Sequence, residues 1–406
     1  MSNLNGGIMD ARKRWAYLAL AMLCLFFGGV VYAWSILKIP FATEFGWQTA
    51  ALTLNFTLTM CFFCVGGIVG GTISKRCGAK IALLFAAALT FTGFMFVSRL
   101  SGQSIALLYI SYGLMGGLGI GISYNVIIST VSAWFPDKKG LSSGCMMMAF
   151  GLSALVLGNA VSALMNDPAG GWRLAFRVLA AGIGAVLTVA AFILHRPPED
   201  LKASPAAESE NVVTSDFTTR EMLRSPSFLR LFIALSFMSA VGNSVIAFAR
   251  DLALSLNATA ALATTLVGVL SVCNGLGRII TGAFFDAFGR RKTTFFVSAL
   301  NIAAVVALLI AVLASSLEIL IGALVLTGLS YGTCPSITSV YAVEFYGVRY
   351  FPTNFSVMNF NLMGAALLAS GYGLLLSVSG GYVIPVAALL VLSVNAAVLN
   401  ITTCKP

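Results

Sequence analysis

Long apolar runs alternate with short polar clusters along almost the whole chain. A helix needs about twenty apolar residues to cross a bilayer, and on that measure the pattern predicts twelve membrane-spanning helices. The fold class is therefore an all-α polytopic membrane protein. The predicted spans are 15–37, 49–73, 79–98, 103–133, 140–165, 172–195, 228–250, 260–286, 293–314, 317–345, 352–377 and 380–402.

One polar segment is longer than the others and divides the helices into two sets of six. It reads 196-RPPEDLKASPAAESENVVTSDFTTREMLRSP-226 and is rich in Pro, Ser and acidic residues, a composition typical of linkers. We therefore predict a six-helix half over 1–195, a cytoplasmic linker over 196–227 and a second six-helix half over 228–406.

The two halves repeat short sequences at equivalent places. The loop 71-GTISKRCGAK-80 matches 282-GAFFDAFGRRK-292, so that Gly71 and Gly78 coincide with Gly282 and Gly289. The turns 134-WFPDKKGLSSG-144 and 345-FYGVRYFPTNF-355 match in the same way. A duplicated six-helix unit is the organisation expected of a transporter whose halves rock, so the repeats predict pseudo-symmetric halves.

Composition and charge support a membrane protein and exclude a nucleic-acid partner. Only 9% of the 406 residues are charged, against about 25% in soluble domains. The net charge of +10 comes from short clusters between apolar runs. With the N-terminus in the cytoplasm, 18 of the 24 Lys and Arg lie on the cytoplasmic side and five lie outside. The positive-inside rule then predicts a multi-pass protein of the cell (inner) membrane with both termini cytoplasmic.

The remaining basic residue, Arg278, lies inside the apolar run 266-LVGVLSVCNGLGRIITGAFF-285. A guanidinium at that depth costs roughly 2.5–3.5 kcal/mol on insertion scales, and it cannot lose its proton. No Asp or Glu lies within one helical turn of it. Two interpretations remain open: a structural ion pair with an acid on another helix, or an anionic substrate as the partner.

The other reactive side chains argue against an enzyme, and no cofactor or metal is expected. The chain has one histidine, its eight cysteines are scattered, and its fourteen Asp and Glu fall in loops or at helix ends. A membrane enzyme would need paired carboxylates, a metal cluster or a nucleophile–base arrangement near the spans. A secondary transporter is the leading class. A sensor that keeps a transporter fold stays open, because a binding site alone serves both roles.

Specific segments carry a family resemblance. The loop 282-GAFFDAFGRR-291 fits the GxxxDxxGRR pattern of the major facilitator superfamily, which implies a gating role for Gly282, Asp286, Gly289 and Arg290. The first half departs from this pattern, with Lys75 at the Asp position. Further segments resemble the oxalate/formate antiporter family, which is related to the monocarboxylate transporters: Tyr32-Ala33-Trp34, 134-WFPDKKGLSSG-144, 221-EMLRSPSF-228, 249-ARDLALSL-256 and 274-NGLGR-278.

This resemblance implies that Arg278 binds the carboxylate of a small substrate. A guanidinium holds a carboxylate through two parallel hydrogen bonds. Proton-coupled monocarboxylate transporters have an Asp where this chain has Asn274, and oxalate exchangers have a Lys where it has Leu362. One positive charge then matches a monocarboxylate such as formate, lactate, pyruvate or acetate. The alternative is an oxalate:formate type of antiport.

The acids also bear on coupling. Because no carboxylate lies at mid-membrane depth, we expect anion exchange or uniport, or a proton that enters with the substrate and a terminal acid such as Asp251. The expected partners are a small carboxylate, membrane lipid, and a proton or a counter-anion.

Aromatic and amide side chains inside the apolar runs are further candidates for substrate contact. A tyrosine hydroxyl is a hydrogen-bond donor on an apolar wall, and an unpaired amide there is costly. Bonding between helices is the alternative role for each. Besides Arg278 and Asn274, the candidates are Tyr32, Tyr124, Tyr331, Asn125, Asn359 and Asn361, with Phe150 and Phe360 as residues that shape the site.

Overall fold

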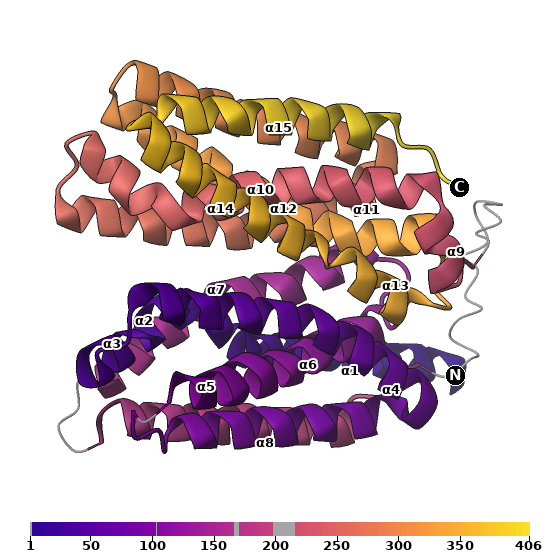
Figure 1. The fold of residues 1–406 in the computed structure, drawn as a ribbon. Coiled ribbons are helices and arrows are strands. Elements are labelled where there is room, and N and C mark those ends of the chain that lie inside the picture. Colours follow the sequence, from indigo (N-terminus) through magenta and orange to yellow (C-terminus); the bar gives the residue numbers. More distant parts are fainter. Residues whose placement is uncertain (1, 103, 166–169, 198–215) are drawn as a thin grey trace. The chain divides into compact units, whose positions relative to one another are not determined.

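The computed structural model describes residues 2–102, 104–165, 170–197 and 216–406. Residues 198–215, most of the predicted linker, lie outside the described residues. All regular elements in the described ranges are helices (Figure 1). The chain divides into two compact units, one of residues 1–213 with 355–357 and the other of residues 214–354 with 358–406.

Unit 1 contains the first six predicted spans. Its membrane helices are interrupted more often than hydropathy suggests, because short 3-10 and π-helical segments connect α-helices within two of the spans. In chain order the elements are α1 (Ser2–Gly28), the 3-10 helix η1 (Gly29–Ala33), α2 (Trp34–Leu37), α3 (Ile39–Phe45), α4 (Thr49–Val97), α5 (Ile105–Leu108), the π-helix η2 (Tyr109–Gly116), α6 (Gly117–Ser132), α7 (Lys139–Met165) and α8 (Gly171–Ile193).

Unit 2 contains the second set of spans, preceded by one short helix at the end of the linker. Thr218 and Glu221 form a capping box that starts this short helix, with the Thr218 side chain accepting from the Glu221 backbone N–H. The elements that follow residue 215 are α9 (Thr219–Arg224), α10 (Pro226–Ser255), α11 (Ala260–Leu313), α12 (Leu317–Tyr346), α13 (Phe351–Met358), α14 (Asn361–Ser379) and α15 (Val383–Thr402).

The predicted number of spans is confirmed. Ten helical segments of the described chain are long and apolar enough to cross a membrane. Two of them are double length, 44 residues within α4 and 49 within α11, and each is broken at a glycine. Gly78 has φ +87° and Gly289 has φ +71°, so neither is helical. Each long helix therefore supplies two crossings, which gives twelve.

Besides the fourth span, which contains η2, two predicted spans are interrupted where the sequence predicts continuous helices. The first changes from α-helix to 3-10 helix at Gly29, where a Cβ atom would overlap the carbonyl oxygen of Phe150 on α7. The span predicted at 352–377 is divided at Asn359 and Phe360 into α13 and α14. The run around Gly29 stays apolar, so the pattern gives no sign of the first break, whereas Asn359 and Asn361 interrupt the apolar run at the second.

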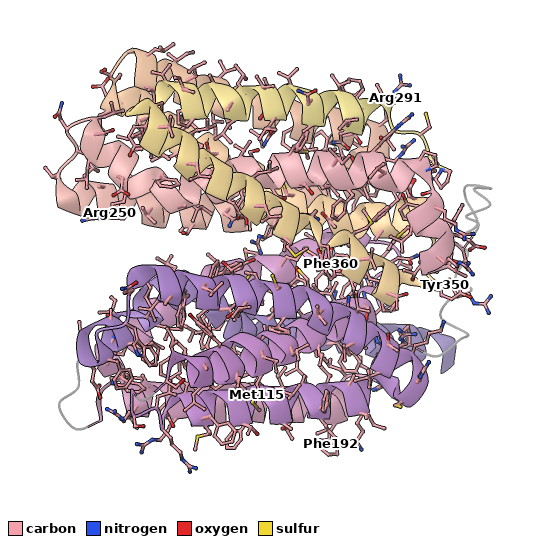
Figure 2. All side chains as sticks on the ribbon, in the orientation of Figure 1. Met115, Phe192, Arg250, Arg291, Tyr350 and Phe360 are labelled. Carbon is pink, nitrogen blue, oxygen red and sulfur yellow. The ribbon has the colours of Figure 1, made fainter. Side chains whose placement is uncertain are left out.

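Side chains on the outside of each unit are apolar, as a lipid environment requires. Val378 is 87% exposed, Leu367 69% and Phe192 65%. Figure 2 shows Phe192 at the periphery of unit 1. It also shows Arg250 and Arg291 at opposite ends of unit 2. Apolar flanks and charged ends are the arrangement of helices that cross a bilayer.

An ion pair and a hydrogen bond connect α3 to α8 in unit 1. The Glu44 carboxylate accepts from Trp172 Nε1 at 2.6 Å and from Arg173 Nη2 at 2.6 Å. The hydrogen bonds from Arg173 and from Trp172 lower the pKa of Glu44 from its ordinary value.

The last residues of the linker are bonded to the turn between α12 and α13. The Phe217 backbone N–H donates to the Tyr346 carbonyl at 3.1 Å, and Asn354 Nδ2 donates to the Phe217 carbonyl at 3.0 Å. Asp216 Oδ1 accepts from the Arg349 backbone N–H at 3.1 Å. Thr219 Oγ1 adds a bond of 2.8 Å to Asn354 Oδ1. We call residues 216–219 the linker clasp.

Candidate functional site

Helices α11 and α12 pack closely at the helical turn that carries Arg278. A Cβ atom on Gly332 would overlap the backbone carbonyl oxygen of Asn274 and would lie 3.0 Å from the backbone nitrogen of Arg278. A Cβ on Gly277 would likewise overlap the Leu329 carbonyl oxygen. Small residues of this kind let membrane helices pack backbone to backbone. The glycines therefore fix the height of Arg278 relative to α12.

Arg278 is buried in unit 2, with 4% of its surface exposed. Its carbonyl oxygen accepts from Ser336 Oγ on α12 at 3.0 Å. The charge predicted to lie inside the membrane thus lies inside a helix bundle and not on its apolar surface.

Asn274 lies one helical turn before Arg278, on the same side of α11. It is 8% exposed, and α12 covers its backbone at Gly328 and Gly332. Its side-chain oxygen Oδ1 is buried and accepts no hydrogen bond from any residue that the structure describes. A buried carbonyl oxygen of this kind is costly without a donor. It is the clearest unmet polar requirement beside Arg278 on α11.

Tyr331 points from α12 towards α10. Its ring lies directly on the backbone of Gly242, where a Cβ atom would overlap the ring. Its hydroxyl donates to Asn243 Oδ1 at 2.7 Å. Asn243 was not among the sequence candidates, although the signal that selected the other asparagines, an amide in an apolar run, was available for it. The role of Tyr331 in substrate contact stays a prediction.

Asn359, Phe360 and Asn361 lie together at the break between α13 and α14, and Figure 2 labels Phe360 there. Asn359 is 6% exposed and Phe360 is half-buried. Asn361 Nδ2 donates to the Met358 carbonyl at 2.8 Å and lies 3.5 Å from Thr338 Oγ1. These bonds support the alternative role of Asn361, which is to connect helix ends. Interrupted helices are common at transporter binding sites.

In unit 1, three predicted site residues from three different elements come together. Tyr32 (η1) and Tyr124 (α6) both pack edge-on against Phe150 (α7), with ring centroids 5.4 Å and 4.9 Å away. Phe63 contacts the same rings at 5.1 Å from Tyr124 and 5.9 Å from Phe150. Asn125, next to Tyr124, is 1% exposed. The aromatic cluster is a structural fact, whereas its contact with substrate remains predicted.

The predicted gating residues lie at the bend of α11. Gly282 is buried, Gly289 forms the bend itself, and Asp286 is exposed. The Arg290 guanidinium lies over the Phe345 ring, 5.1 Å from its centroid. This contact gives Arg290 a packing role against α12. Gating by Gly282, Asp286, Gly289 and Arg290 stays a prediction.

Asp251, the candidate for proton coupling, is exposed near the end of α10. Burial and the nearby Asp251 carboxylate raise the pKa of Tyr382. Along the chain, Asp251 precedes Arg278 by 27 residues and lies on the preceding helix. Within the described residues, no three or more His, Cys, Asp or Glu side chains form a group that could hold a metal ion.

Comparisons with known proteins agree with this architecture. The family model of the Major Facilitator Superfamily matches residues 17–370. The oxalate:formate antiporter of Oxalobacter formigenes is 31% identical over 291 residues, which cover 71% of this chain and 67% of that protein. Monocarboxylate transporter 13 of Bos taurus is 24% identical and covers 64% of this chain and 58% of its own length.

Solved structures show the same fold at low sequence identity. The proton:xylose symporter XylE has a TM-score of 0.74 at 15% identity, covering 96% of this chain and 95% of its own. The transporter FucP in its outward conformation has a TM-score of 0.74 at 12% identity, covering 97% and 100%. The predicted fold class and the expectation that the chain is not an enzyme are both confirmed by these relatives. The chain belongs to the major facilitator superfamily of membrane transporters and is similar to the oxalate:formate antiporter.

Proposed function

We propose that this chain is a secondary transporter that moves small monocarboxylate anions by alternating access, with Arg278 holding the substrate carboxylate. The observation that carries the proposal is the burial of the Arg278 guanidinium inside a membrane helix bundle. A buried cation that keeps its proton needs an anion or water. A charge-assisted bond contributes about 1.5–3 kcal/mol, which allows both recognition and release.

The charge of the substrate follows from the charges that α11 and α14 offer. The apolar part of α11 contains no cation besides Arg278, and α14 has the half-buried Leu362 at the position where oxalate exchangers carry a lysine. A dianion beside one guanidinium would keep one charge unmatched in a low-dielectric site. Formate, acetate, lactate and pyruvate are therefore the favoured class.

Oxalate:formate antiport is the second candidate, and the 31% identity to the Oxalobacter formigenes antiporter favours it. The two candidates differ in how oxalate competes. Proteoliposomes would be loaded with formate, and uptake of labelled formate would be measured against each unlabelled acid. We expect monocarboxylates to compete better than oxalate, and Arg278→Gln to abolish counterflow. Oxalate outcompeting every monocarboxylate would establish the second candidate instead.

Coupling belongs to the same proposal. We infer anion exchange or uniport, or proton entry through Asp251 together with the substrate, in a bacterial inner membrane with both termini cytoplasmic. An imposed pH gradient across the liposome distinguishes these routes. If the gradient drives uptake and Asp251→Asn leaves that uptake intact, then neither proton-independent transport nor proton entry through Asp251 is correct. If substrate binds and counterflow is absent, the chain is a sensor on a transporter fold.

A further inference from the structure

The side-chain oxygen of Asn274 is a hydrogen-bond acceptor that the described part of unit 2 leaves unfilled. It is buried one turn before Arg278, and the residue is 8% exposed. Leaving a buried acceptor without a donor has a free-energy cost that a ligand or water removes by bonding to it. The position beside the carboxylate-binding arginine makes the substrate itself a candidate donor.

The hydroxyl groups on the neighbouring turns donate elsewhere. Thr281 Oγ1 donates to the Gly277 carbonyl at 2.7 Å, and Ser271 Oγ donates to the Val267 carbonyl at 3.0 Å. On α12, Ser336 Oγ donates to the Arg278 carbonyl at 3.0 Å. Each hydroxyl carries a single hydrogen, so these three side chains have none left for Asn274 while their bonds last.

Tyr331 is committed in the same way. Its hydroxyl hydrogen goes to Asn243 Oδ1 at 2.7 Å, and its ring is held on the backbone of Gly242. While that bond lasts, the Tyr331 hydroxyl can take part in a further hydrogen bond only as an acceptor, through its oxygen. An ionised carboxylate also only accepts, so neither Asn274 Oδ1 nor the Tyr331 oxygen can bond to it. Among these groups, the carboxylate has Arg278 as its donor.

We propose that Asn274 is a specificity-determining residue that accepts a hydrogen bond from a second group of the substrate, the hydroxyl of a 2-hydroxy carboxylate whose carboxylate is held by Arg278. This rests on the proposed function. Residues four apart on a helix lie on the same face. A 2-hydroxy acid carries its hydroxyl on the carbon next to the carboxylate, so one small molecule presents an acceptor to Arg278 and a donor to Asn274.

The same reasoning separates substrates that otherwise have the same charge. Acetate and propionate bring no donor to Asn274 Oδ1 and leave the buried oxygen unfilled. Glycolate and lactate are the same acids with one hydroxyl added, and that hydroxyl fills it. A single neutral hydrogen bond corresponds to a preference of about threefold to tenfold for the hydroxy acid.

Two matched pairs of acids test the inference: glycolate against acetate, and lactate against propionate, at neutral pH where all four are ionised. Affinities would be measured by thermal shift of the purified full chain in detergent, and by competition for uptake in proteoliposomes. The wild type should prefer each hydroxy acid by about threefold to tenfold. Asn274→Leu should bring both ratios close to one, with acetate and propionate bound as well as before.

Ser271→Ala is the matched control on the same helix, because Ser271 bonds only to its own helix backbone in the described contacts. It should keep the wild-type ratios. Equal affinities of the wild type for the two acids of each pair would overturn the inference, and this comparison can be made on the wild-type protein alone. It would also be overturned if Asn274→Leu kept the ratios, or lowered the affinity for all four acids equally. Binding that survives Arg278→Gln would instead contradict the proposed function.

Discussion

Gly78 and Gly289 are equivalent residues of the two sequence repeats, and both adopt a backbone conformation with positive φ that breaks a double-length helix. Their ψ angles of 163° and −180° place both in a region that is essentially restricted to glycine. The repeat therefore preserves a backbone shape as well as a sequence pattern. Each bend lets the chain leave one membrane span and enter the next without a separate loop.

We expect Gly78→Ala and Gly289→Ala to destabilise the protein by about 1–3 kcal/mol each. The space around both positions is open, with no atom within 4 Å of an added Cβ. Any loss is thus a backbone effect. Thermal unfolding in detergent measures it, and Gly322→Ala is the control, because Gly322 has equal space inside α12 and a helical backbone. Equal effects at all three glycines would contradict the explanation.

Arg278→Lys should reduce substrate affinity while keeping the charge. A lysine ammonium cannot form the paired, planar bonds of a guanidinium with a carboxylate. The expected loss is roughly tenfold to a hundredfold, which corresponds to one charge-assisted hydrogen bond. Isothermal titration or thermal shift with lactate measures it. Full affinity in Arg278→Lys would show that charge alone suffices, and Arg99→Gln, at an exposed helix end, controls for a general loss of positive charge.

Gly242→Ala should disturb Tyr331 directly, because a methyl group at position 242 would overlap the tyrosine ring. Forcing extra volume into a packed site costs about 1–3 kcal/mol. Tyr331→Phe keeps the ring and removes only the bond to Asn243. We expect the first variant to unfold at clearly lower temperature and the second to change little. Gly242→Ala combined with Tyr331→Ala should recover part of the loss, since the ring is no longer present.

The Glu44 contacts predict a pH dependence of unit 1. Because hydrogen bonds from Arg173 and Trp172 lower the pKa of Glu44 in the folded state, the ionised carboxylate contributes stability at pH values above its unfolded pKa. That contribution is lost as the pH falls through the lowered folded pKa. The side chain is 40% exposed, so solvent screens the pair and the effect is small. Melting curves from neutral to acidic pH, compared with Glu44→Gln, should converge at the acidic end.

Hydropathy and charge predicted the positions of the helices well, because each span buries enough apolar surface to be visible locally. The break at Gly29 depends on what packs against it. Gly29 ends the α-helix where the Phe150 carbonyl lies, about 120 residues further along the sequence. No property of the residues around position 29 reveals that neighbour. The apolar pattern therefore does not predict contacts between segments that are far apart in the sequence.

The candidate site divides in the same way. Arg278 was predictable, because a guanidinium in an apolar run is costly wherever it packs. The bonding of Tyr331 was not predictable, since it depends on Asn243 on another helix. The unfilled oxygen of Asn274 is also visible only after its neighbours are placed. The sequence thus identifies which side chains need partners, and the structure identifies which partners are already taken.

The linker clasp changes where the chain can be divided. Phe217 and Asp216 are bonded to the turn at Tyr346 and Arg349, so these residues belong to the folded second unit before its first membrane helix begins. Two fragments produced from separate genes should then assemble only if the cut falls ahead of residue 216. A cut after Ser225 would leave the clasp on the wrong fragment and expose its binding turn. The folded second unit already includes residue 216, twelve residues before the span 228–250 that hydropathy predicts.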